Sequence, residues 1–96
     1  MSGKIEVRNV NAPHHVTRVD AEKYLAMKDA LIAVLPKGAP GVTVAEAKAA
    51  LLPALPDHLF PGGAKSGWWL KTVQLDLEAK GELARENTKP LRIYRT

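Results

Sequence analysis

Apolar residues recur at helical spacing after Asp20, and this pattern predicts the first helix. Tyr24, Met27 and Leu31 fall on one face at intervals of three and four residues. The Asp20 carboxylate can accept hydrogen bonds from the backbone amides of the first turn, which lack partners within the helix. Pro36 has no amide to continue the hydrogen-bond ladder. We therefore expect the helix to begin at Asp20 and to end before Pro36.

A second helix is indicated by the segment Thr43–Glu46, which has the spacing of a capping box. The apolar side chains that follow share one helical face. Pro53 lacks the amide that an interior position needs, so this helix should kink or stop near Leu52. In the irregular connection beyond it, we expect Leu59 and Phe60 to reach the core.

The third helix is predicted over Ser66–Lys80, with Ser66 as a helix cap and Gly81 as the left-handed residue that ends it. After it, the segments 83–85 and 91–94 alternate apolar and polar residues around a turn. This alternation predicts a C-terminal hairpin.

The start of the chain also alternates, over Lys4–Val10, which predicts a short strand or an extended arm. Residues 11–15 break the alternation and indicate a loop. We expect residues 1–19 to form this arm and loop and residues 20–96 to form the helical part, within a single domain overall.

The segment Gly67–Leu83 joins the third helix to the hairpin and ends in a Leu-x-x-Lys-Gly-x-Leu run. Together with Thr43–Glu46, it resembles the winged helix-turn-helix domain over about residues 20–95. The resemblance implies an α+β fold of three helices followed by a C-terminal β-hairpin, the wing, with a short N-terminal strand as a possible addition. The chain also resembles a small family of uncharacterised bacterial proteins at residues 9–11, 15–20 and 60–69.

The predicted third helix has two apolar sides when its residues are placed every 100°. Its core side holds Trp69, Leu70, Val73 and Leu77, and a polar strip beside it holds Lys71, Gln74 and Glu78. The opposite side carries an apolar stripe. Three interpretations remain open for that stripe: the N-terminal strand or the long second connection covers it, a homodimer or protein partner packs on it, or it reads DNA bases. Its residues are Trp68, Thr72, Leu75 and Ala79.

The net charge of +4 suggests a binding surface near the C-terminus, because half of this positive charge lies in residues 82–96. Basic wing residues and the amides at the start of the third helix are suited to phosphate contacts. We therefore expect a non-catalytic, transcription-associated module that binds double-stranded DNA through phosphates, with weak sequence preference and steep salt dependence. The alternative is a protein-interaction or homodimerisation module that uses the Trp68/Leu75 face. The candidate DNA contacts are Lys65, Ser66, Lys71, Gln74, Arg85, Lys89, Arg92 and Arg95.

Two features weaken the DNA interpretation. The connection between the second and third helices is longer than the short turn of a helix-turn-helix. Lys71 and Gln74 are also the only residues of the types favoured for base reading on the outer half of the third helix.

Little in the sequence supports catalysis or a cofactor. There is no cysteine, the three histidines are His14, His15 and His58, and two of these are adjacent, which is a poor arrangement for one metal ion. The segment 61–67 ends in a Lys-Ser-Gly step but lacks the spacing of a phosphate-binding loop. We expect no enzymatic activity, metal, cofactor or small-molecule substrate. The absence of a long apolar run leads us to expect a cytoplasmic protein that does not enter a membrane.

Overall fold

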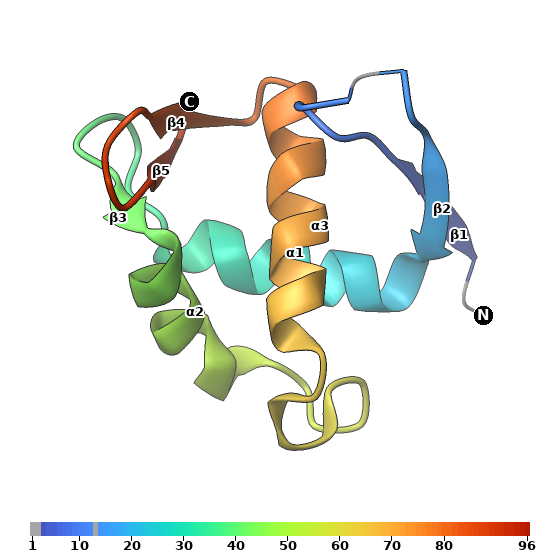
Figure 1. Cartoon of the computed structure of the whole chain (residues 1–96). Helices are drawn as coiled ribbons and strands as arrows, with labels where there is room; N and C mark the ends of the chain where they lie inside the picture. Colours follow the sequence, from blue (N-terminus) through green and yellow to red (C-terminus); the bar gives the residue numbers. More distant parts are fainter. Residues whose placement is uncertain (1–2, 13) are drawn as a thin grey trace.

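Three α-helices and two small antiparallel sheets make up the part of the chain that the computed structural model describes, residues 3–12 and 14–96. The arm and loop expected over residues 1–19 include Met1, Ser2 and Pro13, which lie outside that description. Two short 3-10 segments, Leu52–Ala54 and Pro61–Gly63, interrupt the connection between the second and third helices. The elements follow the order β1 (Lys4–Val7), β2 (Thr17–Asp20), α1 (Ala21–Val34), β3 (Val42–Thr43), α2 (Val44–Leu51), α3 (Ser66–Ala79), β4 (Leu83–Glu86) and β5 (Arg92–Arg95) (Figure 1).

The helix ends follow local sequence signals, with one exception. The Asp20 side chain accepts from the amides of the first turn of α1, and Thr43 and Glu46 form the reciprocal capping box of α2. Gly81, at φ 78°, ends α3 as predicted. The prediction that Ser66 caps α3 is wrong: Lys65 occupies the cap in the left-handed region at φ 59°, and Ser66 is the buried first residue of the helix.

The C-terminal hairpin is confirmed, and it belongs to a sheet of order β3-β5-β4. The strand β3 was not predicted, because two residues are too few to show an alternating pattern. The N-terminal strand does not join this sheet. It pairs instead with β2, a strand that sequence reasoning missed, to form a second hairpin. Figure 1 shows the two hairpins on opposite sides of α3.

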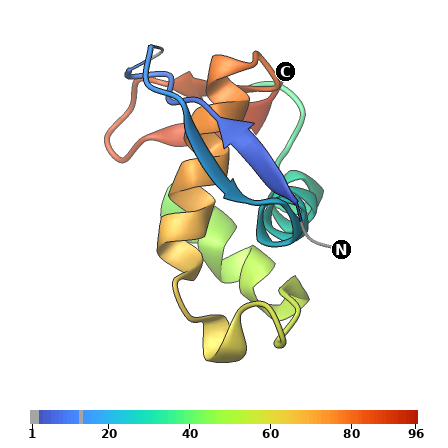
Figure 2. The same ribbon diagram turned by 90° about the vertical axis from the view of Figure 1, so that its right-hand side faces the viewer.

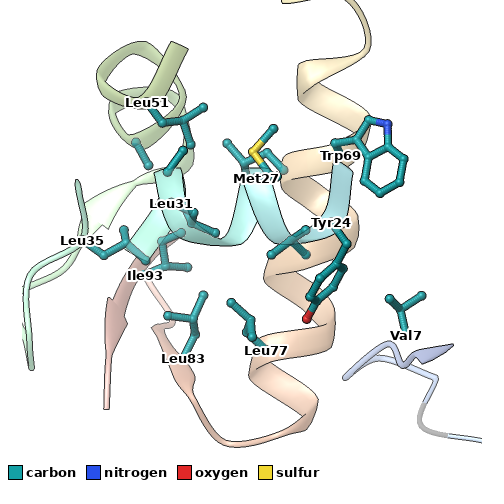
Figure 3. Close-up of a cluster of buried hydrophobic side chains, with 14 of the residues drawn as sticks. Val7, Tyr24, Met27, Leu31, Leu35, Leu51, Trp69, Leu77, Leu83 and Ile93 are labelled. Atoms are coloured by element: carbon teal, nitrogen blue, oxygen red, sulfur yellow. The ribbon is translucent and has the colours of Figure 1, made fainter. Parts of the chain in front are cut away.

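The core lies where α1, α2, α3 and the C-terminal sheet meet. Met27 and Leu31 of α1 are fully buried beside Leu77 of α3 and Ile93 of β5 (Figure 3). Val7 of β1 belongs to the same buried cluster. A two-stranded hairpin is marginally stable on its own, so this packing is what holds the N-terminal hairpin in place.

In the described residues, no helix combines the length and the apolar character that a membrane crossing requires.

Candidate nucleic-acid interface

The outer face of α3 differs between its two halves. In the N-terminal half, Trp68 is 56% exposed and Lys71 is exposed. In the C-terminal half, Gln74 and Leu75 are buried, at 4% and 8% exposure. The N-terminal hairpin lies alongside α3, as Figure 2 shows from the side. Only the first two turns of α3 therefore present an accessible outer surface.

This arrangement bears on the first interpretation of the second apolar stripe, that another segment of the chain covers it. The N-terminal segment does cover Leu75, as the first interpretation expected, and Thr72 and Ala79 are partly covered. Trp68 stays exposed. Its ring lies 5.0 Å from that of Trp69 at an interplanar angle of 83°, and Trp69 is buried, so the two neighbouring indoles point to different surroundings as expected.

Gln74, which the sequence places on the polar strip of α3 as a candidate DNA contact, is buried in the structure. Its side-chain amide donates to Glu78 at 3.2 Å, and the side chain is buried beneath the wing side of α3. A hydrogen-bonded, buried amide cannot reach a base edge. This leaves Lys71 as the one residue of the two predicted base readers that is accessible.

Asp76, which has no exposed surface, fixes the N-terminal hairpin to α3. Its carboxylate accepts from the backbone amide of Arg8 at 2.7 Å, from the Tyr24 hydroxyl, and from the Lys80 ammonium at 2.8 Å. Burial raises the pKa of Tyr24, and the hydrogen bond to Asp76 raises it further. One carboxylate thus joins β1, α1 and α3.

Sequence reasoning did not single out Asp76. A signal was present, because at 100° per residue Asp76 falls between the two apolar stripes of α3. If another segment of the chain covers the second stripe, a charged group there is buried and needs hydrogen-bond donors from elsewhere in the fold. The identity of those donors, Arg8 and Tyr24, depends on tertiary contacts that no local pattern reveals.

Arg85, a predicted phosphate contact, is instead paired within the protein. Its Nε bonds to Oε1 of Glu78 and its NH2 donates to Oε2 of the same carboxylate at 2.7 Å. The Glu78 side chain is only 3% exposed. The hydrogen bonds to Glu78 raise the pKa of Arg85. This two-point pair joins the wing to α3 and neutralises the charge of Arg85.

The other wing arginines also donate inside the fold. Arg92 donates to the carbonyl oxygen of Gly41 at 3.1 Å, and Arg95 to that of Leu35 at 3.0 Å. Residues opposite each other in an antiparallel pair share a face. Arg85, which pairs with Ile93, therefore faces α3, whereas Arg92 lies on the other face.

The four basic wing residues thus do not form one surface. Lys89 lies exposed in the turn, outside both strands.

Two hollows flank the exposed half of α3. The N-terminal hollow, about 340 Å³, lies between α3 and the N-terminal hairpin, and its ionisable lining residues are Arg8, His15 and Lys71. The C-terminal hollow, about 350 Å³, lies between α3, α2 and the wing, and is lined by Lys48, Lys71 and Arg85. Within the described part of the chain, no acidic side chain lines either hollow.

The surface formed by the exposed half of α3 and the two hollows contains both predicted residues and residues that sequence analysis missed. Lys65 and Lys71 are exposed on α3, as expected, while Ser66 is buried. Lys48 was missed, because it lies on α2 far from α3 in the sequence. A Cβ built on Gly67 would lie 3.4 Å from its Nζ atom, so α2 delivers this ammonium group to the first turn of α3.

His14, His15 and His58 are exposed. In residues 3–12 and 14–96, no group of three histidine, aspartate or glutamate side chains is placed to hold a metal ion.

Comparison with protein families gives one match that spans most of the chain. A family model described as "Family of unknown function (DUF6958)" matches residues 4–93. A search of curated proteins finds no match. A search of solved structures likewise finds none.

Proposed function

We propose that this chain, which belongs to the family of unknown function DUF6958, is a non-catalytic winged-helix domain that binds double-stranded DNA mainly through its phosphates. The observation that carries the proposal is the pair of hollows beside the exposed half of α3, both lined by basic and not by acidic side chains. Phosphate contacts dominate the affinity of most DNA-binding proteins.

The chain topology supports the winged-helix part of the proposal. The hairpin β4–β5 follows α3 directly, and the short strand ahead of α2 pairs with β5 to complete a three-stranded sheet. Winged-helix domains combine three helices with a sheet of this kind, and they use the third helix to enter the major groove. The long connection between α2 and α3 differs from the short turn of the simplest members.

The geometry of α3 supports docking in the major groove, which is wide enough to admit an α-helix. Recognition helices commonly contact bases with their N-terminal residues, and the N-terminal half is the part of α3 that is accessible here. With α3 in the groove, the two hollows would face the phosphates on either side. Because Gln74 is buried, few side chains can read bases, and the sequence preference should be weak.

The test is binding to a labelled random-sequence duplex, measured by fluorescence anisotropy over a range of salt concentrations. If Arg8, Lys48, Lys65 and Lys71 each contact a phosphate, the logarithm of the binding constant should fall against the logarithm of salt with a slope of about −3 to −4. Lys71→Ala and Lys48→Ala should each weaken binding at low salt and make that slope shallower by about 0.9.

Matched controls are Lys37→Ala, an exposed lysine between α1 and β3, and Arg92→Ala, on the outer face of the wing. Both remove one positive charge away from the two hollows and should weaken binding less. An absence of binding at low salt would overturn the proposal. Equal losses in Lys71→Ala and Lys37→Ala would show attraction by net charge alone and would overturn the assigned surface.

Homodimerisation or binding of a protein partner through Trp68, Thr72, Leu75 and Ala79 is the alternative. The exposure of Trp68 favours it, although the burial of Leu75 leaves less apolar surface than the sequence implied. Light scattering should then give a dimer that Trp68→Glu dissociates. A monomer at high protein concentration would exclude the homodimer.

A further inference from the structure

Trp68 lies at the edge of the N-terminal hollow and packs against a buried aromatic side chain. Its indole meets that of Trp69 edge to face, and Trp69 in turn packs edge to face against the buried Phe60 at 6.4 Å. An aromatic side chain with buried neighbours on one side and solvent on the other is a ready platform for stacking.

The N-terminal hollow combines an apolar floor with a cationic rim. Val7 and Leu75 are buried at its base, and Arg8, His15 and Lys71 supply its ionisable groups. Its volume of about 340 Å³ lies in the range of pockets that hold small organic groups.

These features match one chemical group better than the alternatives. An apolar peptide would leave the cationic rim without a partner. A nucleotide offers both a planar base for the indole and floor and a phosphate for the rim. Stacking on aromatic side chains with cationic contacts to the backbone is the usual way that proteins hold unpaired bases.

We propose that the N-terminal hollow binds a single unpaired nucleotide of DNA, with its base stacked on Trp68 and its phosphate held by Arg8 and Lys71. The inference rests on the proposed DNA-binding function and deepens it. A base within a paired duplex is enclosed by its neighbours and cannot reach this hollow without leaving the stack. The protein therefore prefers DNA that carries an unpaired base over fully paired DNA.

The experiment compares two labelled duplexes with the same number of base pairs, one fully paired and one with a single extrahelical thymine, which adds one phosphate. Wild-type protein should bind the second about tenfold more tightly, which is the scale of one stacking contact. Trp68→Ala should remove this preference and leave binding to the paired duplex nearly unchanged. Trp68→Phe should restore part of the preference, because phenylalanine keeps an aromatic face.

The matched control is Leu25→Ala, which truncates another large apolar side chain on the surface, 49% exposed and on α1. It should leave the preference intact. A second readout uses Trp69→Phe, in which Trp68 is the sole remaining tryptophan. Its fluorescence should be quenched by the duplex with the extrahelical base more than by the paired duplex. Circular dichroism checks that each variant is folded.

The outcomes separate this inference from the proposed function. Equal affinity of the wild type for both duplexes, or a preference that survives in Trp68→Ala, overturns the inference while duplex binding stands. Binding only to the duplex with the extrahelical base supports the inference and overturns the proposal of general duplex binding. Binding to neither overturns both.

Discussion

On either side of α3, the arginines of the C-terminal hairpin and Arg8 of the N-terminal hairpin are used in opposite ways, although Arg18 of the N-terminal hairpin pairs with Glu6 at 3.7 Å. In the C-terminal hairpin, Arg85, Arg92 and Arg95 all donate to oxygens of the protein itself. In the N-terminal hairpin, the backbone amide of Arg8 binds Asp76 while its side chain lines a hollow beside α3. Within the described residues, no acidic side chain lies within 4.0 Å of the Arg8 guanidinium.

This difference shows why the density of charge along a sequence is a poor guide to a binding surface. The last 15 residues carry half of the net charge, yet most of their arginines hold the C-terminal hairpin against α3, the end of α1 and the segment before β3. Arg85, whose charge is already paired with the Glu78 carboxylate, attracts a phosphate less strongly than an unpaired arginine would. The available cations come instead from β1, α2 and α3.

Removing the attachment of the N-terminal hairpin should have the largest effect. Asp76→Asn places an amide nitrogen among the donors that now surround the carboxylate, so we expect a loss of about 3 kcal/mol in the free energy of unfolding. Urea denaturation measures this loss. Amide hydrogen exchange should show that Arg8 loses its protection first.

The matched control is Asp57→Asn. The Asp57 carboxylate also accepts from a backbone amide, that of Gly62 at 3.1 Å, but at an exposed position. Asp57→Asn should lower the free energy of unfolding much less than Asp76→Asn does. Equal stability of Asp76→Asn and the wild type would contradict the assigned role of Asp76.

The attachment of the C-terminal hairpin can be tested by Glu78→Gln. Loss of the carboxylate removes the charged pair with Arg85 and should cost about 2 kcal/mol in urea denaturation. The released guanidinium lines the C-terminal hollow, so affinity for duplex DNA at low salt should rise.

Glu82→Gln is the control for net charge. Glu82 pairs with Lys28 of α1 at 3.5 Å and takes no part in the Glu78–Arg85 pair. It changes the net charge by the same amount and should raise DNA affinity less. If Glu78→Gln and Glu82→Gln bind duplex DNA with equal affinity, the pairing of Arg85 with Glu78 does not reduce the affinity for DNA.

A smaller effect is expected where β3, which pairs with β5 of the C-terminal sheet, leads into α2. Thr43→Ala removes the capping box and should cost about 1 kcal/mol. The hydrogen bonds from the backbone amide and the hydroxyl of Thr43 lower the pKa of Glu46. The stability gained from ionised Glu46 is therefore present above its ordinary pKa and is lost as pH falls through the lowered value.

Urea denaturation of Thr43→Ala and the wild type at several pH values measures the stability that ionised Glu46 contributes. The difference between them should shrink toward acid. A difference that stays constant across the acid range would show that the Glu46 carboxylate contributes nothing to it.

The helices could be predicted because their signals are local. Asp20, the Thr43–Glu46 box, Pro53 and Gly81 each act within a turn of the backbone they control, and the structure has helix ends at all four. Ser66 was misjudged because a serine before an apolar run suits a cap, but the left-handed Lys65 takes that place.

The candidate site could be predicted only in part. Lys65, Trp68 and Lys71 were found because they lie at or near the start of one predicted helix, where periodicity and charge can be assessed from neighbouring residues. Lys48 and Arg8 were missed because elements distant in the sequence bring them to α3.

The sequence alone determined the three helices, the C-terminal hairpin and the presence of a second apolar stripe on α3, since periodicity and capping depend on residues a few positions apart. Only the tertiary structure decided which charges are available to a ligand. A second hairpin folds over half of that stripe, Asp76 holds it there, and Glu78 withdraws Arg85 from the surface. These outcomes depend on which donor meets which acceptor across the fold, and the order of residues along one element does not specify that pairing.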